Sequence, residues 1–158
     1  MTTKNITIVA MIAAIYVLLT YIFAPLSFNF IQFRVSEVLT VLPFFTPLAI
    51  PGLFIGTLLA NLFSPAGIYD VIFGSLATLI AAYLTSLTKN KYLAPLPPVI
   101  VNAVIVGTLL GVIGGLPVSI PWLIVYVGLG QIGVCYILGI PFMFLLERYR
   151  HVLPWGKK

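Results

Sequence analysis

The chain has few charged residues and few of the side chains on which enzyme chemistry depends. Only 7% of its 158 residues are charged, with three acidic residues, one histidine and one cysteine. The single cysteine, Cys135, excludes an internal disulfide and any metal site built from several cysteines. The single histidine, His151, lies in a basic C-terminal tail, where a histidine is ordinarily solvated. We therefore expect no metal site.

Catalytic sequence motifs are also missing. The chain has no activated serine motif, no histidines and carboxylates at metal-ligand spacing, and no glycine-rich loop that leads into a lysine. We therefore expect no enzyme activity and no cofactor, and any ATP would have to be used by another subunit.

Hydrophobic residues, by contrast, are abundant. They make up 61% of the chain, and the mean hydropathy of +1.19 is far above the range of soluble domains. The sequence therefore predicts an all-α integral membrane protein with a single domain over residues 1–158. The net charge of +5 does not indicate nucleic acid, because the basic residues stand at the ends of apolar runs and form no stripe with interleaved aromatics.

Apolar runs separated by prolines and charges predict about six transmembrane helices. They cover residues 5–24, 35–46, 50–63, 70–88, 99–113 and 120–146. The second and third runs are short, and Pro43, Pro47 and Pro51 interrupt regular backbone there. Two tilted spans and a re-entrant hairpin buried among other helices both fit this pattern.

The basic residues predict how the chain lies in the membrane. With both termini in the cytoplasm and six crossings, seven of the eight lysines and arginines face the inside, and Arg34 faces outward. The apolar run 6–23 resembles a signal peptide only superficially, because no polar region with a small-residue cleavage site follows it. We expect it to be a retained span.

Small residues recur at four-residue spacing in three of the predicted helices. Such faces let helix backbones approach closely in lipid, within one protein or against a partner subunit. For the third and fifth helices we favour internal packing. For the first helix, internal packing and contact with a partner subunit both remain open. The residues are Gly52, Gly56 and Ala60 in the third helix, Gly107 and Gly111 in the fifth, and Ala10 and Ala14 in the first.

Polar side chains within the membrane mark the candidate binding site, because a charge there is costly unless it is paired or faces a polar cavity. The densest group is the stretch Gln32-Phe33-Arg34-Val35-Ser36-Glu37. The predicted topology places four polar residues near the outer ends of their helices, which indicates an outward-facing pocket. These are Arg34, Glu37, Asn61 and Asp70, with Gln131 at mid-depth.

Structural roles remain open for these charged residues. Arg34 and Glu37 are three residues apart and could simply pair with each other, and Asp70 could cap the N-terminus of the fourth helix. Gln131 is the hardest to explain structurally, because an amide at mid-membrane needs partners and a pocket would supply them.

The remaining polar and aromatic residues also have two interpretations. Asn61, and Asn102 toward the cytoplasmic side, could be hydrogen-bonding contacts between helices or ligand contacts. Tyr69, Trp122 and Tyr126 are aromatic neighbours of the predicted pocket, and Tyr69 and Trp122 could equally be interfacial aromatics.

Several sequence motifs, in order along nearly the whole chain, resemble the queuosine precursor transporter family. They are the Gln32 to Glu37 stretch, Leu42-Pro43-Phe44-Phe45, Pro51-Gly52-Leu53-Phe54-Ile55-Gly56, Asp70-Val71-Ile72-Phe73-Gly74-Ser75-Leu76-Ala77-Thr78-Leu79, Leu93-Ala94-Pro95-Leu96-Pro97-Pro98, Val101-Asn102-Ala103, Gly115-Leu116-Pro117 and Val134-Cys135-Tyr136.

The resemblance implies the six-helix fold of a substrate-binding S component of an energy-coupling factor transporter in the prokaryotic plasma membrane. Such a subunit captures a micronutrient outside the cell and docks on a membrane coupling subunit that carries two ATPases. In S components an alanine-rich face of the first helix contacts the coupling subunit, and Ala10 with Ala14 resembles that face. The implied substrates are 7-deazaguanines on the route to queuosine, such as preQ0 or preQ1.

The candidate residues are chemically compatible with such a ligand. A carboxylate such as Glu37 accepts two adjacent N–H donors of a guanine-like edge, and a second carboxylate, Asp70, favours an aminomethyl cation. Gln131 or Asn61 reaches the remaining polar positions of the ring. Phe33, Tyr69 or Tyr126 stacks on its plane.

The chain departs from the family pattern at two places. Gln131 follows Gly130 where an acidic residue is expected, and a second expected acid is missing near Leu109. A neutral deazaguanine, a cationic one or a different small heteroaromatic vitamin therefore remain open, as does a ligand-free accessory protein that only packs against other helices.

Overall fold

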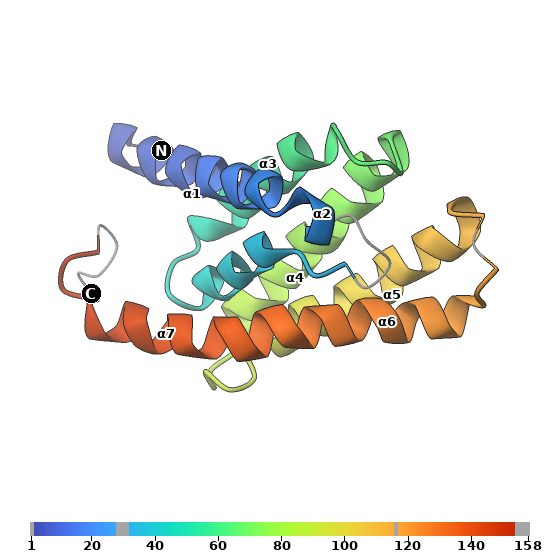
Figure 1. Cartoon of the computed structure of the whole chain (residues 1–158). Coiled ribbons are helices and arrows are strands. Elements are labelled where there is room, and N and C mark those ends of the chain that lie inside the picture. The colour runs from blue at the N-terminus through green and yellow to red at the C-terminus, as the bar shows by residue number, and fades with distance from the viewer. Residues whose placement is uncertain (1, 28–31, 116, 154–158) are drawn as a thin grey trace.

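A computed structural model describes residues 2–27, 32–115 and 117–153, and every regular element in these ranges is a helix (Figure 1). The prediction of an all-α protein is thereby confirmed for the described residues. The elements are α1 (Thr3–Ile22), α2 (Ala24–Ser27), the 3-10 helix η1 (Val35–Phe44), α3 (Ala49–Asn61), the π-helix η2 (Asp70–Gly74), α4 (Ser75–Leu87), α5 (Leu96–Ile113), α6 (Ile120–Ile132), the π-helix η3 (Gly133–Leu138) and α7 (Gly139–Arg148).

Four helical stretches of the described chain are long and apolar enough to cross a membrane. They are α1, η2 with α4 (Asp70–Leu87), α5, and α6 to α7 (Ile120–Arg148). The helices η1 and α3 are apolar but shorter. The chain is therefore a multi-pass membrane protein, and its helices follow the predicted apolar runs closely.

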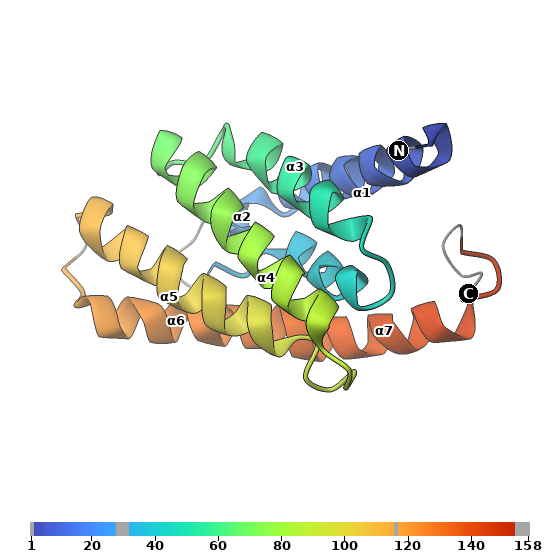
Figure 2. The same ribbon diagram turned by 180° about the vertical axis from the view of Figure 1, so that it is seen from behind.

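The 3-10 helix η1 lies at the centre of the bundle, packed against α1, α3, α4, α7 and η3 (Figures 1 and 2). At about 2.0 Å per residue its 10 residues rise only about 20 Å, and Pro43 lies inside it. Non-helical or irregular backbone is tolerated at membrane depth only where protein covers it, and here helices surround η1.

Both termini of the described chain lie at one end of the molecule (Figures 1 and 2). The connector 62–69 lies at the opposite end, where α3 turns back into η2, and so do the end of α5 and the start of α6. The last residue of α3 and the first residue of η2 therefore lie toward the end away from the termini.

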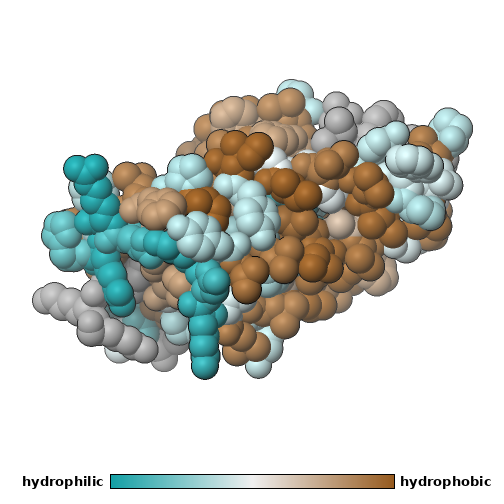
Figure 3. Space-filling model, turned by 90° about the horizontal axis from the view of Figure 1, so that it is seen from below, coloured by the Kyte–Doolittle hydropathy of each residue, from teal (hydrophilic) through white to brown (hydrophobic). Residues whose placement is uncertain are grey.

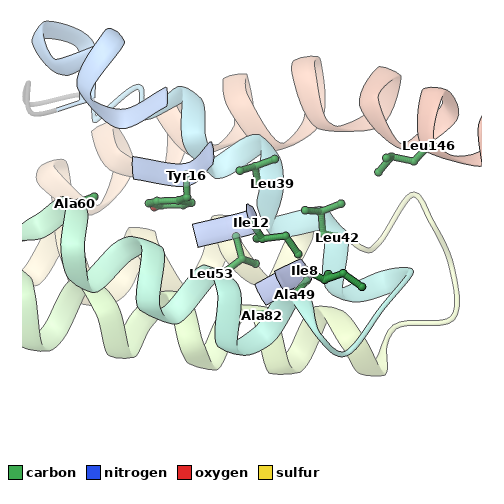
Figure 4. Close-up of a cluster of buried hydrophobic side chains, with 10 residues drawn as sticks. All are labelled: Ile8, Ile12, Tyr16, Leu39, Leu42, Ala49, Leu53, Ala60, Ala82 and Leu146. Atoms are coloured by element: carbon green, nitrogen blue, oxygen red, sulfur yellow. The ribbon is translucent and has the colours of Figure 1, made fainter. Parts of the chain in front are cut away.

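The contact between α1 and α3 depends on two glycines of α3. A Cβ at Gly52 would lie 2.9 Å from Ile12 Cβ, and a Cβ at Gly56 would lie 2.9 Å from Tyr16 Cβ. Ile12 and Tyr16 point from α1 into the apolar core that Leu53 of α3 also enters (Figure 4). The small face of the third helix therefore serves internal packing.

The glycines of α5 have the same role against α6. A Cβ at Gly107 would lie 2.7 Å from Ile124 Cα, so the two backbones pass close together. By contrast, Ala10 and Ala14 of α1 are exposed and face away from the bundle. The small face of the first helix is thus the one that remains available to a partner.

The surface combines an apolar body with one polar end. Figure 3 shows hydrophobic residues over most of the face seen from below and hydrophilic ones gathered at one end. That end includes exposed Lys89, Arg148 and Arg150, and an ion pair of 3.0 Å between Lys91 Nζ and Glu147 Oε2. The predicted basic residues Lys157 and Lys158 lie outside the described residues.

Candidate functional site

Five of the predicted site residues lie together in the interior. Arg34 precedes η1, Glu37 lies in its first turn, Asn61 ends α3, Asp70 begins η2 and Gln131 lies near the end of α6. Each is at most 5% exposed. They come from four separate segments of the chain, so the folded bundle and not local sequence brings them together.

Arg34 organises the part of this cluster nearest the end away from the termini. Its Nη1 donates to Asn61 Oδ1 at 3.1 Å, and its Nη2 lies 3.6 Å from Asp70 Oδ2. Asn61 Nδ2 in turn donates to the backbone carbonyl of Asp70 at 3.0 Å. The guanidinium therefore joins the start of η1 to the α3–η2 turn.

Glu37 organises the deeper part. Tyr16 Oη donates to its Oε1 at 2.5 Å, and Asn102 Nδ2 donates to its Oε2 at 3.3 Å. Asn102 Nδ2 also lies 3.2 Å from Gln131 Oε1, which accepts from it. One carboxylate thus connects α1, η1, α5 and α6 in an apolar interior, where such bonds gain strength from the low dielectric.

These contacts bear on the structural roles that the sequence left open. Arg34 and Glu37 are neighbours along the chain, yet each engages other partners across the fold. Asp70 caps no helix among the described residues, since neither of its carboxylate oxygens accepts a hydrogen bond there. Asn102, for which a contact between helices and a ligand contact both remained open, is hydrogen-bonded to both Glu37 and Gln131.

Sequence reasoning missed several members of the cluster. Cys135, which was not among the predicted site residues, lies with its Sγ 3.5 Å from Gln131 Oε1 and 3.8 Å from Thr40 Oγ1. Tyr16 and Thr20 were not considered. Tyr16 and Thr20 follow Ile12 at intervals of four residues on the buried face of α1, and this period was the available signal, because side chains at that spacing point to the same side of a helix.

The three predicted aromatic contacts occupy different environments. Phe33 is half-buried, and its ring lies where a Cβ on Gly133 would be 2.7 Å from it, two residues beyond Gln131. Tyr126 is 38% exposed and lies against Trp122, with ring centroids 6.3 Å apart. Tyr69 is 50% exposed.

A pocket of about 710 Å³ lies between η2 and α5, separate from the polar cluster. Its walls are almost wholly apolar. The lining residues are Tyr69, Phe73, Val104, Ile105, Thr108, Leu109, Val112 and Ile113. The polar residues that were predicted to line a pocket thus form a cluster whose side chains bond to one another. The pocket between η2 and α5 is instead part of the apolar surface.

The family model described as QueT transporter matches residues 6–148, a range that contains every residue of the polar cluster. The chain belongs to the QueT transporter family. The residues that carried the resemblance in the sequence therefore identified the family correctly, and the family supports a transport role.

A relative of this QueT-family chain is the "Queuosine precursor transporter QueT" of Lactococcus lactis subsp. cremoris (strain MG1363), which is 37% identical over 92 residues. The match covers 57% of this chain and 54% of the relative, so it spans only about half of the relative's length. No solved structure matches the chain.

The cluster of this QueT-family member offers hydrogen-bond donors and acceptors together with charges of both signs. It holds two carboxylates, one guanidinium and three amides, with donors and acceptors of both kinds. Among the described residues no group of three or more His, Cys, Asp or Glu side chains is placed to hold a metal ion.

Proposed function

We propose that this chain is the substrate-binding S component of an energy-coupling factor transporter that takes up a queuosine precursor, a 7-deazaguanine. The observation that carries the proposal is a buried cluster of Arg34, Glu37, Asn61, Asp70 and Gln131 inside an otherwise apolar bundle. Buried polar groups in a membrane protein are costly and ordinarily mark a substrate pathway. The relative's description as a queuosine precursor transporter supports the substrate class.

The ligand would replace part of the bonding within the cluster. Glu37 uses one lone pair on each oxygen for Tyr16 and Asn102, and a carboxylate offers about four acceptor sites, so it can still accept a pair of ring N–H groups. Gln131 and Asn61 supply amides for the remaining ring positions. Phe33 supplies an aromatic face beside them, and Tyr69 and Tyr126 stay predicted contacts at the rim.

Coupling to the energising module would use the exposed face of α1. Ala10 and Ala14 lie on this face with no large side chain between them and the surroundings, so the backbone of a partner helix can approach closely. We propose that the partner is the membrane coupling subunit, which carries two ATPases. The opposite face of α1 carries Tyr16, so one helix links the docking surface to the ligand cluster.

The topology proposed with this function has six crossings, with both termini in the cytoplasm of a prokaryotic cell. The termini lie at the same end of the described structure as exposed Lys4, Lys89, Arg148 and Arg150. Basic residues at one end favour a cytoplasmic location for that end. The Arg34, Asn61 and Asp70 part of the cluster then lies toward the outside.

Calorimetric titration of the purified chain with guanine, the nitrile deazaguanine and the aminomethyl deazaguanine tests the substrate class. At least one deazaguanine should bind with one-to-one stoichiometry and should bind more tightly than guanine. Uptake of that ligand into cells should require co-expression of the coupling subunit and its ATPases. Uptake by the chain alone, or failure of all three ligands to bind, would contradict the proposal.

A further inference from the structure

Asn102 joins two of the predicted site residues through a single amide nitrogen. Its side chain is buried on α5, and its Nδ2 lies 3.3 Å from Glu37 Oε2 on η1 and 3.2 Å from Gln131 Oε1 on α6. An amide nitrogen carries two hydrogens, so it can donate to both oxygens at once. Asn102 therefore uses both of its donors within the protein.

The carboxylate of Glu37 determines which way these amides point. Its two oxygens accept hydrogen bonds from Tyr16 and Asn102. An ionised carboxylate can only accept, so Asn102 has to turn its NH2 group toward Glu37. The same NH2 group faces Gln131, which therefore presents its oxygen. One carboxylate thus orients two amides in series.

A second donor holds the Gln131 amide in this direction. Cys135 follows Gln131 by four residues, and its Sγ donates to Gln131 Oε1 at 3.5 Å. A thiol is a weak donor, but it has no competing acceptor closer than this oxygen among the described residues. The oxygen of Gln131 thus accepts two hydrogen bonds, and the protein occupies both of its lone pairs.

The nitrogen of the same amide is left for a ligand. Gln131 is 3% exposed, and no hydrogen bond in the described part of the chain uses its Nε2. This nitrogen is also absent from the unpartnered polar atoms that the described residues enclose completely, so it borders space that a ligand can reach. A buried N–H group without an acceptor is costly, and the site therefore favours a ligand that brings an acceptor oxygen.

The packing of α5 against α6 keeps Asn102 beside Gln131. A Cβ at Gly107 would lie 2.7 Å from Ile124 Cα, and a Cβ at Gly128 would meet Ala103 Cβ at 3.4 Å. The two helices are therefore in close contact along the interface that Asn102 and Gln131 share, which fixes their register.

We propose that Asn102 is a positioning residue, which turns the Gln131 amide so that its Nε2 donates to a carbonyl oxygen of the substrate. The inference rests on the proposed transport function and adds the residue that sets the direction of the Gln131 contact. On a guanine-like edge the carbonyl lies next to the N–H groups that Glu37 would accept, and Asn102 holds Gln131 next to Glu37. Asn102 itself does not contact the substrate.

The test compares two ligands on the full-length protein, the nitrile deazaguanine and its counterpart in which an amino group replaces the ring carbonyl oxygen. The readout is the ratio of the two affinities, because a variant that only disturbs the fold weakens both ligands alike. The replacement also changes the neighbouring ring nitrogen, so Glu37 contributes to the ratio. Gln131→Met lacks the amide and measures that contribution. The wild type should prefer the carbonyl compound about 10-fold more strongly than Gln131→Met does.

Asn102→Ala should lower the preference to the level of Gln131→Met, because the released amide can turn either its oxygen or its nitrogen toward the ligand. Adding Asn102→Ala to Gln131→Met should lower the preference no further. Such non-additivity distinguishes an effect through Gln131 from an effect through Glu37.

Thr108→Val is the matched control, since it also removes a hydrogen-bonding side chain from α5 but lies in the apolar pocket. It should keep the wild-type preference. Cys135→Ala keeps the test independent of how Asn102→Ala folds. It removes only the second donor to Gln131 Oε1 and should lower the preference by about 2- to 3-fold.

Two results would overturn the positioning role. One is an Asn102→Ala variant that keeps the wild-type preference, and the other is a further loss of preference when Asn102→Ala is added to Gln131→Met. If Asn102→Ala does not fold, an unchanged preference in Cys135→Ala overturns the role instead. Failure of every deazaguanine to bind the wild type is a different result, which overturns the proposed function and this inference with it.

Discussion

Tyr16 and Glu37 form a contact between α1 and the polar cluster. The Tyr16 ring is 0% exposed and packs among the apolar side chains of the core, while its hydroxyl reaches a carboxylate. The residue therefore contributes to stability in two separable ways. Removing the hydroxyl while keeping the ring isolates the polar contribution.

Tyr16→Phe should lower the free energy of unfolding by about 1–3 kcal/mol, because Glu37 Oε1 loses its donor in a buried site. Thermal unfolding of the purified protein in detergent measures the effect. Tyr83→Phe, at a tyrosine that is 57% exposed on α4, is the control and should unfold like the wild type. Equal melting temperatures for all three proteins would show that the bond carries no net stability.

Glu37→Gln should weaken binding of every deazaguanine by about 30- to 1000-fold, since it replaces an acceptor by a donor that faces ring N–H groups. The stability of the folded protein should fall less than the affinity for the ligand. The amide oxygen of the glutamine can still accept from Asn102, and the Tyr16 hydroxyl can accept a hydrogen bond from the amide where it donated one to the carboxylate. Titration together with melting curves separates the two effects. An unchanged affinity with a lowered melting temperature would instead make Glu37 a purely structural residue.

The sequence identified part of the cluster because polar residues are rare in its apolar runs. Arg34, Glu37, Asn61, Asp70 and Gln131 were predicted on that ground, and the structure brings them together. Which of them bond to each other was not predictable, since that depends on how helices far apart in the chain pack. Tyr16 was missed because tyrosine, with 8 copies, is also the usual residue of membrane interfaces.

Helix α3 packs so closely against α1 that one added methyl group on α3 would push the two helices apart. A Cβ at Gly56 would lie 2.9 Å from Tyr16 Cβ and 3.1 Å from the Ala13 carbonyl oxygen. The neighbouring atoms are close to or part of the α1 backbone, so α1 itself would have to move. This would also pull Tyr16 away from Glu37.

Gly56→Ala should therefore destabilise the protein by about 1–3 kcal/mol, in the range of other overpacked cores. The matched control is Gly128→Ala on α6, where the added Cβ would meet Ala103 Cβ at an ordinary 3.4 Å. Melting curves of the two variants should differ clearly. If they coincide, the α1–α3 contact is looser than the structure indicates.

Ala10→Leu combined with Ala14→Leu should abolish transport and co-purification with the coupling subunit, because bulky side chains keep a partner helix away from α1. The affinity of the isolated protein for its ligand should stay within about 3-fold of the wild type, since both residues face outward. Val104→Phe, at an exposed position of α5, is the control for added bulk. Collapse of ligand binding in the double variant would instead assign Ala10 and Ala14 to internal packing.

Local helix type was beyond the reach of the sequence pattern. The short run 35–46 was predicted as a helical segment, but its 3-10 form depends on the helices that cover it and on Pro43. The π-helices η2 and η3 each replace α-helical hydrogen bonds inside a long apolar run, which leaves hydrophobic periodicity almost unchanged. The ends of the apolar runs, set by prolines and charges, were predictable.

Across the whole molecule, the two ends of the bundle should lie on opposite sides of the membrane. Cysteines introduced at exposed Asn90 and exposed Pro65 lie in connectors at opposite ends, the first on the side of the basic residues. In intact cells a membrane-impermeant thiol reagent should label Pro65→Cys and leave Asn90→Cys unlabelled until the cells are opened. Labelling of both from the same side would exclude the proposed topology.

The buried thiol of Cys135 allows ligand binding to be followed in the native chain without an added label. It is the only sulfhydryl in the sequence, is 0% exposed, and contacts the Gln131 amide in the polar cluster. A small membrane-permeant alkylating agent can consume it only when the helices part, so the alkylation rate measures how often the interior opens. A bound ligand should lower the alkylation rate of Cys135. Docking of a coupling subunit that promotes ligand release should raise it.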